Sequence, residues 1–242
     1  MFWKKKPVKL IFYTSDKNTF DFFRPRLGSD MLPSWWKKIE TKKETSMKGC
    51  VGLIHSYSNA IVIPMWSDCS ISVLSNGEYF YKFFDGVTEI TTHSQEQRGD
   101  FAPNDEYTHF KIRSPWVVHC DEDIKFVFTQ NAFSFLKPDD FIPLTGVIDF
   151  KYQHSTNLNL FVKNPPVEKT VSLTANTPFV FIYPMTERNI EIEYRLITIP
   201  EWDDIMKEGL VYEKNAFFRK KKLMKELESS KSKCPFGFGG DK

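Results

Sequence analysis

The sequence has little of what marks disordered, disulfide-stabilised or membrane-spanning chains. Only 11 of the 242 residues are glycine, and the 14 prolines are spread along the chain, which argues against disorder and low complexity. The four cysteines stand far apart and form no C-x-x-C pair. No apolar run approaches the roughly 18 residues that a membrane helix requires. We therefore expect a soluble globular protein that does not contact a membrane.

The beginning of the chain also lacks a secretion signal. Its first ten residues, MFWKKKPVKL, carry positive charge but no apolar h-region. Without such a signal we expect the four separated cysteines to be reduced, as they are in an intracellular compartment.

The motifs of several common enzyme classes are absent as well. The sequence has no P-loop, G-x-G-x-x-G, G-x-S-x-G or H-E-x-x-H pattern, which removes the usual nucleotide-binding, hydrolase and zincin interpretations. Each cysteine is expected to be a small buried residue, because no base is placed beside it in a way that would activate the thiol. The sequence thus predicts no catalytic residue, no metal site and no cofactor.

Aromatic residues and alternating patterns dominate what is present. The chain has 23 phenylalanines, and we expect most aromatic rings in a core. Residues 61–73, 179–192 and 115–128 each place two apolar stretches on either side of a short polar turn. The first two segments carry matching Pro-Met pairs at 64–65 and 184–185. This alternation predicts three equivalent hairpins, each half-buried against one core.

The pattern as a whole predicts an all-β, jelly-roll-like sandwich of repeated hairpins. Residues 1–200 are expected to form the sandwich, with a possible seam between two halves at 131–145. Residues 201–242 are expected to form a helical, basic C-terminal tail.

Short helices and one tight turn complete the predicted fold. Helices are expected over residues 34–40, with Ser34 as the N-cap, over 201–207 and over 215–228. An Asn-Gly pair at 76–77 lies between two apolar segments and predicts a hairpin with a type I′ turn.

The net charge of +2 is distributed unevenly along the chain. Residues 214–233 hold eight Lys and Arg against two Glu, a local charge of +6, which leaves −4 on the remainder. A basic segment beside a mildly acidic body is typical of an interaction element. We expect this segment to form a helix that docks on a partner, with acidic or phosphate groups facing its lysines.

Three parts of the chain, WWKK at 35–38, residues 48–50 and IPMWSDCSISV at 63–73, resemble an uncharacterised family found on marine tailed-phage genomes. That family has a Trp-Trp-Lys segment, a following cysteine, an Ile-Pro-Leu-Trp-x-Asp strand and a later proline-bearing hairpin similar to FVFIYPM. Met65 stands where the family has leucine, and the resemblance covers roughly residues 25 to 197. It implies a viral origin, a location in the host cytoplasm or the virion, and no particular activity.

One alternative is an iron(II) oxygenase on a double-stranded β-helix, with His119, Asp121 and a distant His154 as its His-x-Asp and His ligands. The fold class suits that enzyme, but the interval from Asp121 to His154 is short and no arginine closely follows His154 to hold a 2-oxo acid. His119 and Asp121 also occupy the turn of the third predicted hairpin, where aspartate is favoured for backbone reasons. We therefore interpret them as turn residues that do not converge with His154 on one point.

Aromatic and basic residues occur together at several places and mark candidate binding residues. Lysines neutralise phosphates, and exposed rings stack on bases or sugars. The candidates are Trp35, Trp36, Lys37, Lys38, Trp66, Arg219, Lys220, Lys221 and Lys222. A carbohydrate-binding module with Trp35, Trp36 or Trp66 as its platform is a second alternative. If these residues have no binding role, each tryptophan is expected to belong to the core and each lysine to a solvated face.

These features favour a non-enzymatic, phage-encoded binding or assembly protein. It would act through the surface of its β-sandwich and through its basic C-terminal helix. The expected partner is a protein or a second copy of the chain, and a polyanion or nucleic acid is a further expected ligand of the basic segment.

Overall fold

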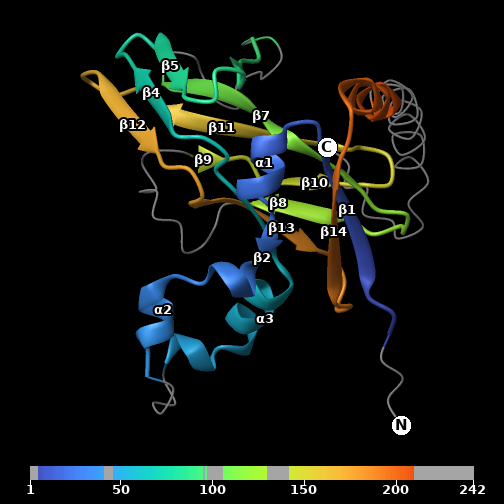
Figure 1. The fold of residues 1–242 in the computed structure, drawn as a ribbon. Helices are drawn as coiled ribbons and strands as arrows, with labels where there is room; N and C mark the ends of the chain where they lie inside the picture. Colours follow the sequence, from blue (N-terminus) through green and yellow to red (C-terminus); the bar gives the residue numbers. More distant parts are fainter. Residues whose placement is uncertain (1–4, 41–45, 95, 97–105, 130–141, 210–242) are drawn as a thin grey trace, which may run out of the picture.

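A computed structural model describes residues 5–40, 46–94, 96, 106–129 and 142–209. Within these residues the chain is mostly β, with three sheets and short helices (Figure 1). This confirms the all-β class predicted from the sequence. The helix expected over 215–228 lies outside the described residues.

The strands belong to three sheets, which we name A, B and C. Sheet A contains, in spatial order, β14 (Ile190–Leu196), β1 (Val8–Thr14), β7 (Tyr107–His119), β11 (Ser155–Lys163) and β9 (Ile142–Pro143), with β6 (Ile90–Thr91) also paired to β7. Sheet B contains β10 (Gly146–Ile148), β8 (Phe126–Thr129), β13 (Pro178–Pro184), β3 (Ile61–Pro64) and β2 (Arg26–Leu27). Sheet C contains β12 (Lys169–Leu173), β4 (Cys69–Val73) and β5 (Tyr79–Phe83).

Short helices flank the sheets. They are α1 (Lys17–Phe22), η1 (Gly28–Met31), α2 (Ser34–Lys38), η2 (Met47–Gly49), α3 (Val51–Asn59) and a helix over residues 199–209. The helices predicted over 34–40 and 201–207 are therefore confirmed in place. The predicted N-cap is one residue off, because Pro33 is the cap and Ser34 is the first helical residue.

The helix over 199–209 begins with reciprocal capping. The backbone N–H and the hydroxyl of Thr198 each donate to the Glu201 carboxylate at 2.7 Å, and the Glu201 N–H donates back to Thr198 Oγ1 at 3.5 Å. This is a capping box, in which a T-x-x-E sequence satisfies backbone donors at the helix start. It fixes the direction in which the chain leaves β14.

The three segments predicted as hairpins are crossings between sheets. The strands β3 and β4 belong to sheets B and C, β13 and β14 to B and A, and β7 and β8 to A and B. The hairpin prediction is therefore wrong in its pairing. Pro64 and Pro184 do each end a strand, and Ile71 and Ile190 lie in the same buried core. Alternation specifies which face of a strand is buried but not which strand lies beside it.

One crossing forms half of a bent two-stranded ribbon. Because β3 pairs with β13 and β4 with β12, residues 61–73 and 169–184 run side by side through sheets B and C. At the bend, the Met65 N–H donates to Thr177 O at 2.8 Å, and the Asn176 N–H donates to Met65 O at 2.7 Å. Asn176 has a φ of 65°, a left-handed conformation that asparagine tolerates.

A second ribbon bends in the same way between sheets A and B. The strand β7 pairs with β11, and β8 pairs with β10. Across the bend, the Val118 N–H donates to His154 O at 2.8 Å and the Cys120 N–H donates to Phe150 O at 3.2 Å. Residues 131–141 of the predicted seam lie outside the described residues. The strand β8 before the seam and the strand β10 after it pair in sheet B, and β9 within the seam pairs with β11 in sheet A.

The Asn-Gly pair at 76–77 joins β4 and β5, which confirms the hairpin predicted there. The turn type is different, because only Gly77 has a positive φ, of 83°, whereas a type I′ turn needs two. The Gly77 N–H donates to Leu74 O at 3.1 Å, and the Leu74 N–H donates to Glu78 O at 2.8 Å. Asn76 contributes through its side chain, since its Oδ1 accepts from the Glu78 N–H at 3.0 Å.

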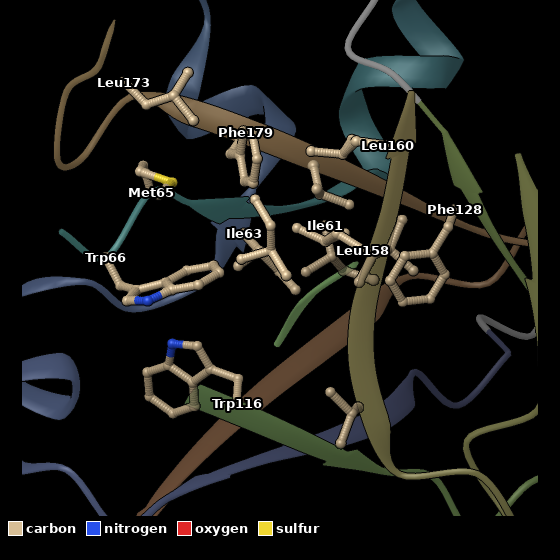
Figure 2. Close-up of a cluster of buried hydrophobic side chains, with 14 of the residues drawn as sticks. Ile61, Ile63, Met65, Trp66, Trp116, Phe128, Leu158, Leu160, Leu173 and Phe179 are labelled. Atoms are coloured by element: carbon tan, nitrogen blue, oxygen red, sulfur yellow. The ribbon is translucent and has the colours of Figure 1, made fainter. Parts of the chain in front are cut away.

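One buried core draws on all three sheets. Figure 2 shows Ile61 and Ile63 of β3 beside Leu158 of β11, so that sheets A and B meet through aliphatic side chains. Trp116 of β7 and Phe12 of β1 are both fully buried in the same cluster. Because the cluster is continuous across the sheets, the two ribbons enclose a single interior.

The helices α2 and α3 form a lobe beside the sheets (Figure 1). A separate apolar cluster joins this lobe to sheet B. It consists of Trp36, Tyr57 and Ala60 from the lobe with Val62 and Phe181 from the sheet.

Gly28, at the base of the lobe, is predicted to tolerate no side chain. Its N–H donates to Ala60 O at 2.7 Å, and a Cβ at this position would lie 2.6 Å from Tyr57 O. A backbone oxygen can move aside only if the chain that carries it moves too. Gly28→Ala should therefore lower the free energy of unfolding by about 1 to 3 kcal/mol. Gly49→Ala is the matched control, because a Cβ there meets nothing within 4 Å. Equal unfolding free energies of the two variants in denaturant titrations would contradict the close packing.

Candidate functional site

His119, Asp121 and His154 are neighbours at the bend of the second ribbon. The His119 Nε2–H donates to Asp121 Oδ1 at 2.8 Å, and the ring centroids of His119 and His154 are 5.3 Å apart. No spacing in the sequence predicts this proximity, which arises because the bend places residues that follow β10 against the end of β7. Among the described residues, no group of three or more His, Cys, Asp or Glu is arranged to hold a metal ion.

Hydrogen bonds to other protein groups hold these two histidines. His154 is buried, and its Nδ1–H donates to Val118 O at 3.0 Å. Burial lowers the pKa of His154, so its ring is neutral at neutral pH. The hydrogen bond from His119 lowers the pKa of Asp121, which keeps that carboxylate charged. Both histidines therefore support the bend.

The buried thiols are poor nucleophiles. Cys69 and Cys120 are buried, and Cys50 is exposed. Burial raises the pKa of Cys69 to about 12 and also raises that of Cys120. Because the thiolate is the reactive form of cysteine, neither buried residue has the character of a catalytic nucleophile.

The predicted binding residues of the WWKK segment lie on α2. Trp36 is buried in the lobe cluster, whereas Trp35 is 39% exposed and Lys37 and Lys38 are exposed. The two adjacent tryptophans therefore differ in environment. Lys48 caps the C-terminal end of α2 from outside the helix. Its Nζ donates to carbonyl groups there, including Lys37 O at 3.0 Å.

Trp66 lies in the core, so its ring has no face open to a sugar. It is 3% exposed, and its Nε1–H donates to Thr88 Oγ1 at 2.8 Å. Thr88 in turn donates to the Asp85 carboxylate, and the Asp85 N–H donates to Ser67 Oγ at 3.0 Å. The expectation of Trp66 as a carbohydrate platform is therefore wrong. Its role is to hold the loop at residues 84–88 in place.

A groove of three adjoining hollows is the feature that the sequence did not predict. The central hollow has a volume of about 330 Å³ and lies beside hollows of about 440 Å³ and 160 Å³. The central and larger hollows share Asp16, Val87, Thr88 and Pro115. The central and smaller hollows share Lys111, Arg113 and Asn157. The groove therefore extends from α1 across β7 to the helix over 199–209.

The larger hollow forms an apolar section, which we define by Phe22, Phe84 and Val87. These side chains are 65%, 64% and 79% exposed. Exposed large apolar side chains gathered around one hollow are typical of an interaction surface. The loop that carries Phe84 and Val87 is the one that Trp66 holds, so the core sets the shape of this section.

The other two hollows form a basic section, which we define by Lys111, Arg113 and Asn157. Lys111 and Arg113 alternate along β7 with Ile112, which is fully buried, so both cations are on the outer face of sheet A. Trp202 and Met206 from the helix over 199–209 line the same section.

The sequence carries only a partial signal for this groove. The alternation of Lys111 and Arg113 with buried residues marks them as outward-facing. Phe22, Phe84 and Trp202 come from separate elements with no shared spacing, so no local pattern brings them together. The groove depends on which strands and helices become neighbours, and this is a property of the tertiary fold.

The remaining candidates, Arg219, Lys220, Lys221 and Lys222, lie outside the described residues, so the basic docking helix stays a prediction. In the described part of the chain, no helix has the length and apolar character needed to cross a membrane. No family model matches the chain, and no match is found among curated proteins.

Proposed function

We propose that the chain is a non-enzymatic, phage-encoded binding or assembly protein that holds an extended segment of a partner protein in the groove. The observation that carries this proposal is the continuity of the three hollows. An elongated groove with separate apolar and polar sections suits a peptide chain, which presents successive side chains along its length.

The apolar section supplies the anchor of this interaction. Apolar and aromatic anchors that enter a pocket dominate the affinity of protein interfaces. Phe22 and Phe84 are available for such contact because each is about two-thirds exposed. The segment would gain affinity by covering these two rings and Val87.

We further propose that the sandwich has a jelly-roll topology. The strand pairs are nested along the chain, with β3 and β13 outermost, then β4 and β12, then β7 and β11, then β8 and β10. A long antiparallel ribbon folded back on itself produces such nesting, as in double-sheet jelly rolls. An experimental structure that lacked any of these four pairings would contradict the assignment.

Peptide selection on the full chain tests the proposed function. Peptides from a random displayed library should be enriched on the protein, and their affinity should fall about tenfold or more in Phe22→Ser and Phe84→Ser, because anchors dominate such interfaces. Phe80→Ser is the matched control, since Phe80 is also 65% exposed but lines none of the three hollows.

The control variant should bind the selected peptides with wild-type affinity. Thermal melting of all three variants should match the wild type, because exposed side chains contribute little to the core. Failure to enrich any peptide, or an equal loss of affinity in Phe80→Ser, would contradict the groove as the binding site.

A further inference from the structure

The two cations of the basic section stand opposite neutral residues. In the antiparallel pairing of β7 with β11, Lys111 is paired with Asn159 and Arg113 with Asn157. Neither cation forms an ion pair with a described residue within 4.0 Å. Strand β7 therefore places two adjacent cations in the groove, each opposite an amide of β11 and not a carboxylate.

Two cations on the neighbouring strands β1 and β14 of sheet A are neutralised. Lys9 of β1 and Arg195 of β14 both pair with the Glu193 carboxylate. Two acids, Asp16 and Glu89, also line the central hollow, but neither forms an ion pair with Lys111 or Arg113 within 4.0 Å. Asp16 Oδ1 is the N-cap of α1 and accepts from the Thr19 N–H at 2.5 Å. The basic section thus holds two neighbouring cations that form no ion pair with a described residue.

The amide of Asn157 adds a polar group that needs a partner. Its Oδ1 is buried and has no hydrogen-bond partner, and its Nδ2 donates to Ser155 Oγ at 3.4 Å. Turning the amide over keeps a hydrogen bond to Ser155, because a hydroxyl both donates and accepts. In either orientation the atom in the buried position has no exposed surface, so the charge of the section comes from Lys111 and Arg113 alone.

A carboxylate complements both cations of the section. Guanidinium groups bind carboxylates with two parallel hydrogen bonds, and an ammonium group adds charge without demanding one geometry.

We propose that the basic section binds an Asp or Glu side chain of the partner segment, whose apolar side chain covers Phe22 and Phe84. This inference rests on the proposed function, since it names the partner chemistry of the same groove. It makes the groove selective for segments in which an acidic residue follows or precedes an apolar anchor at a fixed interval. The charge sets which segment binds, and the apolar section sets how strongly it is held.

Peptide selection repeated on Lys111→Glu/Arg113→Glu tests this assignment. Peptides enriched on the wild type should carry Asp or Glu at a constant distance from an aromatic or large aliphatic residue. Their affinity for the double variant should fall at least about tenfold. Raising the salt concentration should weaken peptide binding to the wild type, because the attraction is electrostatic, and this salt dependence should be absent in the variant. Peptides selected on the variant should carry Lys or Arg at the same position.

The matched control is Lys5→Glu/Lys163→Glu, which changes the net charge equally at exposed positions outside the groove. It should bind the acidic peptides with nearly wild-type affinity. Selected peptides without acidic enrichment would overturn the acidic-partner assignment and leave the groove as the binding site. Failure to select any peptide would overturn both. Binding of an oligothymidylate probe in competition with the selected peptides, but more tightly than any of them, would assign the section to phosphate instead.

Discussion

Replacing Trp116 with alanine is expected to lower the free energy of unfolding by about 3 to 5 kcal/mol, the usual cost of removing a buried aromatic side chain. Trp116 is fully buried on β7. Its ring packs edge-on against Phe12, with centroids 6.1 Å apart, and lies 6.1 Å from Tyr194. Its Nε1–H also donates to Phe23 O at 3.2 Å, at the end of α1. The substitution removes both the packing and this tie between sheet and helix.

Denaturant unfolding followed by far-UV circular dichroism would measure this loss. Trp116→Phe should retain much of the packing but leave the Phe23 carbonyl without its donor, so we expect an intermediate loss of about 1 to 3 kcal/mol. Trp35→Ala is the control for removing an indole, because Trp35 is 39% exposed on the lobe. A loss for Trp35→Ala as large as that for Trp116→Ala would show that the core has been wrongly located.

The burial of individual strands could be predicted from the sequence, but their partners could not. In residues 61–73, alternation correctly indicated that Ile71 and Val73 face the core. The same pattern predicts a hairpin, whereas β3 and β4 lie in different sheets. The reason is physical: side-chain alternation records contact with the core, while strand pairing is formed by backbone groups that every residue carries. Only the Asn-Gly pair at 76–77 encoded a pairing locally, through its turn.

The candidate site shows the same division between local and tertiary information. The sequence marked Trp66 as notable but could not show that it acts from the core on Thr88. Lys111 and Arg113 were ordinary strand residues in the sequence. They became a site only because the helix over 199–209 and the loop carrying Val87 lie beside β7. Residues that meet across separate elements leave no spacing to detect.

Replacing Lys125 with methionine is the second change with a large expected effect on stability. Lys125 Nζ pairs with Asp149, whose side chain is only 7% exposed, across the bend of the second ribbon. The hydrogen bond to Asp149 raises the pKa of Lys125, so the ammonium group stays charged at neutral pH. Asp149 Oδ1 also accepts from the Lys151 N–H at 3.1 Å, which shapes the turn after β10. Lys125→Met would leave the buried carboxylate without a cation.

Lys125→Met should lower the free energy of unfolding by about 2 kcal/mol, less than the 3 to 5 kcal/mol of a fully buried pair because Lys125 itself is half-exposed. The chain offers an internal control, since Lys125 Nζ also lies 3.6 Å from Asp123, whose side chain is 82% exposed. Asp123→Asn should change stability by less than about 0.5 kcal/mol, because exposed pairs contribute little. The double variant Lys125→Met/Asp149→Asn should recover part of the loss by removing the unpaired charge. If chemical denaturation instead gives Asp123→Asn and Lys125→Met the same small change, the buried pair does not hold the bend together.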